Sequence, residues 1–274
     1  MKPVVTLTTI PSRLHDISDE GFKACIYSLL RQSVDDYEVW INIPRIHTHS
    51  GKKYIIPSWL EDLEKGDRNL RIFRTEDFGP ATKLIPTVKR ISDPNQIIIV
   101  TDDDLVYHVD TVKAQIENQR KWPESVVGYD GIRGRTEDGK RLNVFGDSRD
   151  HYCVSIQMNV KVDILQHYKT VSYKRRFFEE DFFDFCDKWL MWDDDKLMAS
   201  YFSLKKRDRR ITFHKSDPII NSWEEWLTKG GVKTFPVLDH TKYDFHEGCY
   251  RYRQETEPGL FDIYHEQFID KGYE

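Results

Sequence analysis

The chain has 274 residues, of which 39% are hydrophobic and 13% aromatic, and its formal net charge is −5. These values predict a folded protein with a full core and exclude a disordered one. The negative charge argues against a general binder of nucleic acid or anionic membranes. We see no apolar stretch long enough for a membrane span, no signal peptide and no C-x-x-C pair, so we expect a cytoplasmic protein with reduced thiols.

The first half of the chain alternates between strand and helix patterns. Strands are predicted at 4–9, 38–43, 70–74 and 97–100, and helices at 17–30, 83–91 and 109–120. This order predicts a Rossmann-like, mostly parallel central sheet flanked by helices. Further strands are expected at 126–130, 152–159 and 171–178, further helices at 182–189 and 194–204, and an aromatic-rich tail from Ser222.

The stretch Gln96–Asp104, Q-I-I-I-V-T-D-D-D, is the centre of the predicted site. Its four β-branched residues suit a strand buried on both faces, and ligands of α/β sheets bind at the carboxyl ends of such strands. If strand geometry continues, Asp102 and Asp104 point to one side, with Cα atoms about 6.7 Å apart, and Asp103 points to the other. Three adjacent carboxylates favour a divalent cation, Mn²⁺ or Mg²⁺; the alternative is a solvated acidic loop before a helix.

Two other loops follow predicted strands. T-T-I-P-S-R, with Thr8, Thr9, Pro11 and Arg13, is a plausible nucleotide contact after the first strand. In Asp77–Lys83, Gly and Pro form a tight turn and Thr82 can cap the following helix, which places Lys83 near the ligand edge for a diphosphate or sugar contact. An ordinary capped helix start explains this turn equally well.

A second acidic cluster, Asp193, Asp194 and Asp195, precedes the helix predicted at 194–204. Acidic residues are favoured at a helix N-terminus, so one of them is expected to be the N-cap. The other two are then free to face a cleft.

Four segments in this order resemble a GT-A glycosyltransferase, a nucleotide-sugar-dependent enzyme with a D-x-D motif: V-V-T-L-T-T-I-P-S-R, D-F-G-P-A-T-K, I-I-I-V-T-D-D-D and W-D-D-D-K-L-M-A-S-Y. The resemblance covers essentially the whole chain and extends to small soluble glycosyltransferases of large algal viruses. It implies one GT-A domain over residues 1–274. Residues 1–107 would bind the nucleotide sugar, and residues 108–274 would bind the acceptor and include the tail.

By this resemblance the protein transfers a sugar from a nucleotide diphosphate donor, a UDP-sugar by family habit, to a hydroxyl group of a glycan or glycoprotein, in the cytoplasm of a host if the source is viral. The first loop and Asp77 would hold the base and ribose. Asp102 or Asp103 would contact the ribose or sugar, and Asp104 the metal. In the inverting branch, Asp194 or Asp195 would be the base that deprotonates the acceptor.

The chain also departs from the family pattern. Three aspartates stand where the family usually has Glu-Asp, so the identity of the base stays open. In the segment Val162–Tyr173, where many members have glycines, this chain has Q-H-Y-K-T. Some members use a C-terminal histidine as a further metal ligand, and His246 or His240 could take that place.

Other functions remain open. A haloacid-dehalogenase-type phosphatase would use D-x-D-x-V at 102–106, but its nucleophile normally follows the first strand of the fold. A nucleotidyltransferase usually needs a glycine-rich phosphate loop near its start, which T-T-I-P-S-R is not. A noncatalytic carbohydrate-binding or scaffold protein of the same fold could stack sugars on its tryptophans. Intact acidic residues in both clusters favour the enzyme.

Overall fold

The computed structural model describes residues 2–15, 21–129, 131–132, 136–137, 140–141, 160–189 and 193–212. The strand predicted at 152–159, the aromatic tail, His240 and His246 lie outside these ranges. Among the helices that are described, none is both long enough and apolar enough to cross a bilayer.

Up to residue 100 the elements are β1 (Val4–Thr8), α1 (Pro11–Leu14), α2 (Phe22–Leu30), β2 (Glu38–Pro44), α3 (Ser58–Gly66), β3 (Leu70–Thr75), η1 (Ala81–Lys83), α4 (Ile85–Arg90) and β4 (Ile97–Val100). Beyond it follow α5 (Thr111–Lys121), β5 (Val126–Gly128), β6 (Gly131–Ile132), β7 (Thr136–Glu137), β8 (Lys140–Arg141), β9 (Val160–Lys161), β10 (Ile164–Leu165), η2 (His167–Lys169), β11 (Val171–Lys174), η3 (Arg175–Phe177), α7 (Phe182–Trp189), α8 (Asp194–Leu204) and β12 (Arg209–Ile211).

The described strands form an eight-stranded sheet in the order β3-β2-β1-β4-β11-β5-β12-β9. The first four strands are parallel neighbours, β11 runs antiparallel between β4 and β5, and β5 and β12 are parallel again. The short strands β6 and β10 pair with each other, as do β7 and β8. Because β1 to β4 are parallel, the segments after them lie at one edge of the sheet.

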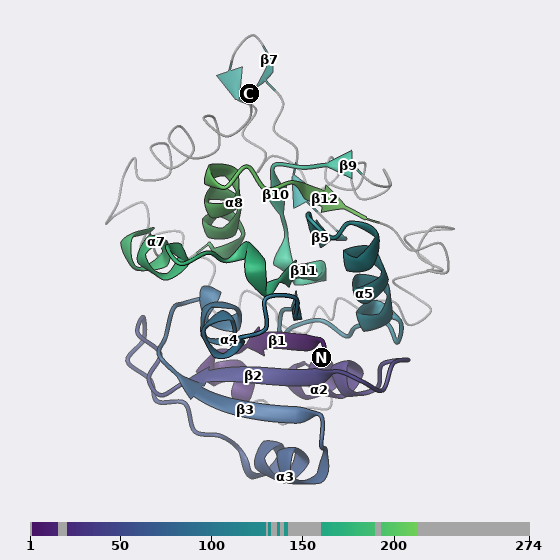
Figure 1. Ribbon diagram of the computed structural model, residues 1–274. Coiled ribbons are helices and arrows are strands. Elements are labelled where there is room, and N and C mark those ends of the chain that lie inside the picture. Colours follow the sequence, from purple (N-terminus) through teal and green to yellow (C-terminus); the bar gives the residue numbers. More distant parts are fainter. Residues whose placement is uncertain are drawn as a thin grey trace.

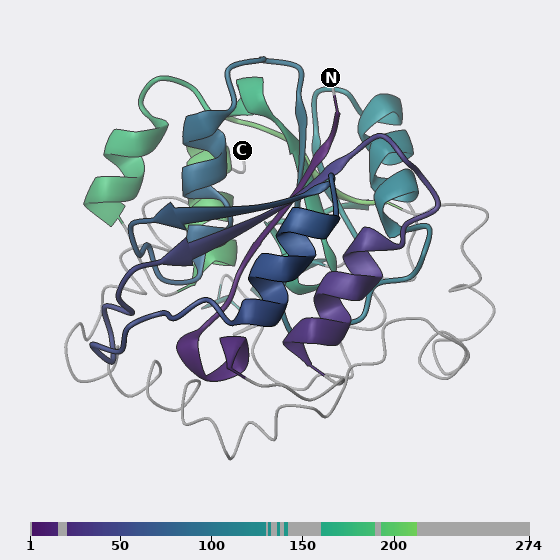
Figure 2. The same cartoon turned by 90° about the horizontal axis from the view of Figure 1, so that it is seen from below.

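Both faces of the sheet are buried, as the runs of apolar residues predicted. Val4 and Ile98 belong to a core shared with α4, α7 and α8, whereas their neighbours Val5 and Ile99 belong to a core shared with α2, α3 and α5. Figures 1 and 2 show these helices on opposite sides of the sheet. Side chains of a strand alternate between faces, so consecutive apolar residues serve both cores.

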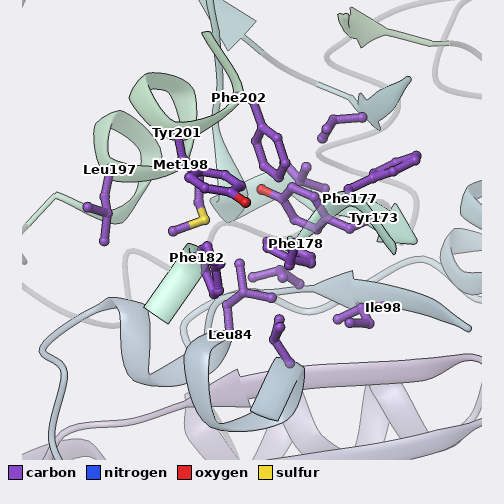
Figure 3. Close-up of a cluster of buried hydrophobic side chains, with 14 of the residues drawn as sticks. Leu84, Ile98, Tyr173, Phe177, Phe178, Phe182, Leu197, Met198, Tyr201 and Phe202 are labelled. Carbon is purple, nitrogen blue, oxygen red and sulfur yellow. The ribbon is translucent and has the colours of Figure 1, made fainter. Parts of the chain in front are cut away.

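Aromatic side chains dominate the core between the sheet and α8. Tyr173 of β11 stacks on Phe202 of α8 with ring centroids 5.5 Å apart, and Phe178 contacts both rings (Figure 3). Pairs of this kind contribute about 0.5–1.5 kcal/mol beyond area burial. This core fixes α8, whose N-terminus carries the second acidic cluster, against β11.

Four local predictions need correction. The strand expected at 171–178 ends at Lys174, and the 3-10 helix η3 follows it. α2 begins at Phe22 rather than at residue 17, because Gly21 with φ +96° precedes it. Pro11 opens the short helix α1 instead of a simple turn, since its fixed φ suits a first helical position. Thr82 does not cap α4: its hydroxyl accepts the Phe78 N–H at 2.8 Å, and Leu84 is the N-cap.

Candidate active site

The acidic loop Asp102–Asp104 follows β4 directly, but it does not continue the strand. β4 ends at Val100, so the side chains do not alternate as strand geometry predicts. Asp103 and Asp104 both contact Arg13 of α1, the latter with 3.4 Å between its Oδ2 and Nη2 of Arg13. Asp102 instead contacts Lys83. The expectation that Asp103 points to the side opposite Asp104 is therefore wrong, because both contact Arg13.

The electrostatics of this loop depend on burial and on Arg13. Burial raises the pKa of Asp104; Arg13 opposes the shift, Asp103 and Asp102 add to it, and the result is a pKa of about 6. Oδ2 of Asp103 is buried and has no hydrogen-bond partner among the described residues. Arg13 therefore compensates the three carboxylates only in part.

Lys83 joins this loop to the second acidic cluster. Its Nζ lies 2.5 Å from Oδ1 of Asp102 and 2.9 Å from Oδ2 of Asp194, and its side chain is 6% exposed. Burial alone would lower the pKa of Lys83, but Asp102 and Asp194 raise it well above its ordinary value. Acidic groups 92 positions apart in the sequence thus meet across one ammonium group.

As the sequence predicted, one aspartate of the second cluster is the N-cap of α8 and the other two are not. Asp193 is the N-cap of α8: its carboxylate accepts the Lys196 N–H at 3.1 Å and also lies 2.7 Å from Nζ of Lys196. Asp194 and Asp195 begin the helix and turn toward His167. Nδ1 of His167 is 2.8 Å from Oδ2 of Asp194 and 2.5 Å from Oδ1 of Asp195.

His167 is buried against the two carboxylates of the second cluster. Burial disfavours the imidazolium ion, but the attraction of Asp194 and Asp195 outweighs it and raises the pKa of His167 to about 9. On the other side of the ring, Nε2 lies 2.5 Å from the hydroxyl oxygen of Tyr173. The backbone N–H of His167 also donates to Oδ1 of Asp195 at 2.9 Å.

Asp194 and Asp195 differ in ways that matter for proton transfer. Burial would raise the pKa of Asp194, but Lys83 and His167 hold it well below its usual range. The pKa of Asp195 is raised by burial, with Asp194 adding to the shift and His167 opposing it. The Asp195 side chain is 27% exposed, against 13% for Asp194. Asp195 is the more basic and more accessible carboxylate.

The short helix η2 that carries His167 is held by a strained residue. Thr170, the residue after η2, has φ +95°, a conformation that β-branched residues rarely adopt. Its N–H donates to the carbonyl of His167 at 2.9 Å, and Gln115 of α5 donates to its hydroxyl at 2.6 Å. Strain of this kind costs about 1–3 kcal/mol and persists where surrounding contacts impose it.

Two sets of residues could hold a cation. The described residues contain one group of three ligand-type side chains whose donor atoms lie within 4.8 Å of one another, namely His167, Asp194 and Asp195. The ammonium of Lys83 already lies 2.9 Å from Oδ2 of Asp194, however, and occupies one side of this group. We therefore treat these residues as an ion-pair network and consider the Asp102–Asp104 loop for the metal.

The case for a cation at that loop rests on net charge and donor type, because the described group of three clustered ligand side chains lies elsewhere. Within the described ranges, the cationic side chains in contact with Asp102, Asp103, Asp104, Asp194 and Asp195 are Arg13, Lys83 and His167. Five carboxylates minus three cations leave two negative charges when all are ionised, the charge that one divalent ion would balance. All-oxygen donors suit Mg²⁺ or Mn²⁺.

The remaining predicted contacts lie around the same edge. Thr8 donates to the carbonyl of Asn42 at 2.7 Å, whereas the Thr9 hydroxyl is buried with no hydrogen-bond partner in the part of the chain described. Asp77 accepts from the N–H groups of Thr48 at 2.6 Å and Gly79 at 3.0 Å, so it also fixes its own turn. His246 lies outside the described residues.

Sequence reasoning missed three residues of the site. His167 contacts the second cluster, and Tyr173 contacts His167. At the acidic loop, the Tyr107 hydroxyl accepts the Asp102 N–H at 2.9 Å and donates to the Tyr168 carbonyl at 3.0 Å. The departure Q-H-Y-K-T was visible in the sequence, but no local spacing links it to Asp195. The packing of α8 against β11, through Phe202 and Tyr173, brings the two together.

A groove of about 650 Å³ lies at the opposite edge of the sheet. Its lining includes Pro3 before β1, Gln96 before β4, and Lys113 and Glu117 of α5. It is thus at the amino ends of the parallel strands, away from both acidic clusters. We assign it no part in the site.

No protein-family model and no curated protein matches the sequence. Solved structures do. S. aureus TarS 1–349 in complex with UDP is 15% identical, with 74% of this chain and 55% of that chain covered and a TM-score of 0.46. Its complex with UDP-GlcNAc is also 15% identical, with 73% of this chain and 53% of that chain covered and a TM-score of 0.42. The 4-diphosphocytidyl-2C-methyl-D-erythritolsynthase of Anaerococcus prevotii DSM 20548 is 14% identical, with 80% of this chain and 94% of that chain covered and a TM-score of 0.48.

The chain thus spans about half the length of the TarS fragment. At these identities and TM-scores the likeness supports no conclusion about the reaction. The strand order of the described residues confirms the expected α/β class with a mostly parallel central sheet and flanking helices. The resemblance to viral enzymes stays a prediction.

Proposed function

We propose that the protein is a metal-dependent glycosyltransferase that moves a sugar from a nucleotide diphosphate donor to a hydroxyl group of a glycan. The observation that carries the proposal is the bridge formed by Lys83 between Asp102 and Asp194. It brings the acidic loop Asp102–Asp104 and the second acidic cluster together at one edge of the sheet, which supports the proposal. A transferase of this kind needs both: one to receive the diphosphate and one to activate the acceptor.

The donor would bind between the first loop and the acidic loop. We propose that Thr8, Thr9, Pro11 and Asp77 contact the base and ribose, that Asp102 or Asp103 contacts the ribose or sugar, and that Arg13 and Lys83 face the diphosphate. Asp104 with Asp102 would hold Mn²⁺ or Mg²⁺, with His246 as a further candidate ligand. When bound, such an ion neutralises the charge of the departing diphosphate.

Asp195 is our candidate for the catalytic base, and Asp194 is the alternative. Both hydrogen bonds from His167 go to Oδ1 of Asp195, and Oδ2 accepts none from the residues described here. Oδ2 would take the proton of the acceptor hydroxyl while the acceptor oxygen forms a bond to the anomeric carbon and the bond to the diphosphate breaks. Attack from the face opposite the leaving group inverts the anomeric configuration.

A donor screen tests the proposal directly. The full-length chain is incubated with Mn²⁺ and UDP-, GDP- or CDP-sugars, with and without simple sugar acceptors, and free nucleotide diphosphate is measured. We expect slow hydrolysis of one donor class, faster turnover with an acceptor, and loss of both with EDTA. Absence of turnover with every donor would count against the enzyme.

A melting experiment separates the alternatives. Stabilisation by UDP and Mn²⁺ together, but not by Mn²⁺ alone, supports the transferase, because a ligand stabilises the state that binds it. Sugar-dependent stabilisation without nucleotide binding would favour a noncatalytic carbohydrate-binding protein. Pyrophosphate release from a nucleoside triphosphate and a sugar phosphate would favour a nucleotidyltransferase, and phosphate release from a sugar phosphate alone a phosphatase.

A further inference from the structure

We infer that His167 and Tyr173 are positioning residues, which hold Asp195 in one orientation so that its free oxygen faces the acceptor hydroxyl. This inference rests on the proposed function, and it assigns a catalytic purpose to two buried residues outside both acidic clusters. His167 acts through its hydrogen bonds to Asp195. Tyr173 acts through the hydrogen bond that fixes the imidazole ring.

The three side chains form a continuous chain of hydrogen bonds, which leads from the partly exposed Asp195 to the buried Tyr173. Oδ1 of Asp195 lies 2.5 Å from Nδ1 of His167, and Nε2 of His167 lies 2.5 Å from the Tyr173 hydroxyl. His167 and Tyr173 are each 1% exposed. Because Oδ1 also accepts the backbone N–H of His167 at 2.9 Å, two donors from one residue fix the same oxygen. Rotation of the carboxylate would break both hydrogen bonds.

The chemistry of this chain suits the support of a base rather than proton abstraction by His167 itself. An imidazolium ion donates from both nitrogens, so Nδ1–H can donate to Asp195 while Nε2–H donates to the Tyr173 oxygen. A cation behind the carboxylate also stabilises its ionised form. His167 has no free lone pair in that state, and its burial keeps it from an acceptor.

The framework around the chain is rigid. Tyr173 lies on β11, where its ring stacks on Phe202 of α8 in the core of Figure 3. On the other side, strained Thr170 and its partner Gln115 fix η2, which carries His167. Asp195 lies in the first turn of α8. The same aromatic core thus sets the distance between the base and the residues that orient it.

The test compares two isosteric replacements of His167. The amide nitrogen of Asn can occupy the place of Nδ1 and keep a donor for Asp195, whereas that of Gln can occupy the place of Nε2 and loses that donor. We expect His167→Gln to lower kcat for donor turnover by about 10²-fold or more, and His167→Asn and Tyr173→Phe by about tenfold each. KM for the donor and UDP affinity should stay within about twofold in all three.

Matched controls separate positioning from packing. Tyr201→Phe removes a buried hydroxyl from the same aromatic core, where it accepts the Glu179 N–H at 2.9 Å. His108→Gln removes a histidine that lies 3.9 Å from Asp110, away from the second cluster. Both should keep the wild-type kcat even if their melting temperature falls. Unequal losses for Gln and Asn at position 167 would not arise from a purely structural role.

Proton NMR supplies a readout that needs no turnover. The short hydrogen bond between His167 and Asp195 should give a resonance far downfield of the amides, present in Tyr201→Phe and lost in His167→Gln and Asp195→Asn. Absence of this resonance in the wild-type protein, or a wild-type kcat in His167→Gln, would overturn the inference. So would loss of Mn²⁺-dependent UDP binding in His167→Gln, which would make His167 a metal ligand.

Failure of the proposed function would give different experimental results from failure of this inference. A wild-type protein that turns over no nucleotide sugar would overturn the transferase proposal. If the downfield resonance were still present, the hydrogen-bonded pair would stand and only its catalytic role would be lost. If it were absent as well, the pair itself would be refuted.

Discussion

At the scale of single residues, the environment of each carboxylate separates roles that the sequence left open. Asp194 is confined between Lys83 and His167, whereas Asp195 is more exposed and keeps one oxygen clear of hydrogen bonds from the described residues. A general base needs an accessible oxygen and a pKa that is not strongly depressed. Asp195 meets both conditions better than its neighbour.

We therefore predict that Asp195→Asn lowers kcat by about 10² to 10⁴ and leaves UDP affinity nearly unchanged. Asparagine keeps the size of the side chain and an oxygen that can accept from His167, so folding should persist. Steady-state kinetics and calorimetry with UDP and Mn²⁺ measure the two effects. Asp193→Asn is the matched control, and it should keep its kcat. Normal turnover in both Asp195→Asn and Asp194→Asn would point to a retaining mechanism without a dedicated base.

A second prediction concerns Asp104, whose pKa of about 6 reflects burial among other acids. Asp104→Ala should weaken Mn²⁺-dependent UDP binding by about tenfold or more, because a carboxylate ligand is lost. Calorimetry with Mn²⁺ and with EDTA should show the difference only when the metal is present. Asp36→Ala, which removes an exposed partner of Lys2, is the control. Equal UDP affinity in Asp104→Ala and the wild-type protein would exclude Asp104 from the metal site.

At the scale of elements, predictions from periodicity and capping succeeded where the local sequence alone sets the first and last residue of an element. α7 and α8 begin and end where their sequence patterns predict. The direction of the side chains at 102–104 was wrong because tertiary ion pairs to Arg13 and Lys83, not strand geometry, orient them. His167 could not be found from spacing, since its link to Asp195 depends on how α8 packs against β11.

The N-terminus of α8 offers a prediction at this scale. Asp193→Ala should lower the free energy of unfolding by about 1 kcal/mol, because the Lys196 N–H loses its acceptor. Asp193→Asn should recover most of this loss, since asparagine is also a good N-cap. Urea denaturation measures the change, and kcat should stay near the wild-type value in both variants. A large loss of kcat in Asp193→Asn would instead give Asp193 a part in the chemistry.

At the scale of the whole molecule, one sheet joins the two halves that the sequence suggested. β1 to β4 come from residues before 107, and β11 and β5 from residues after it, yet β11 pairs directly with β4. The proposed donor and acceptor halves therefore meet inside one sheet rather than across a hinge. Lys83 also joins the two halves at the site, because it contacts Asp102 of the first half and Asp194 of the second.

Lys83 should accordingly matter for folding as well as for donor binding. Its removal leaves Asp102 without its ammonium partner and the buried Asp194 with His167 alone, and breaking a buried pair typically costs about 3–5 kcal/mol. We predict a loss of this size in Lys83→Met, which keeps most of the side-chain volume, measured by urea denaturation of the metal-free protein. In a double-mutant cycle, Asp194→Asn should recover part of the loss, because the unpaired charge is then gone. Lys65→Met, which removes an exposed partner of Asp62, is the control and should change stability by less than about 1 kcal/mol. A similarly small change in Lys83→Met would show that solvent or mobile ions already compensate the two carboxylates, and the bridge between the clusters would lose its structural importance.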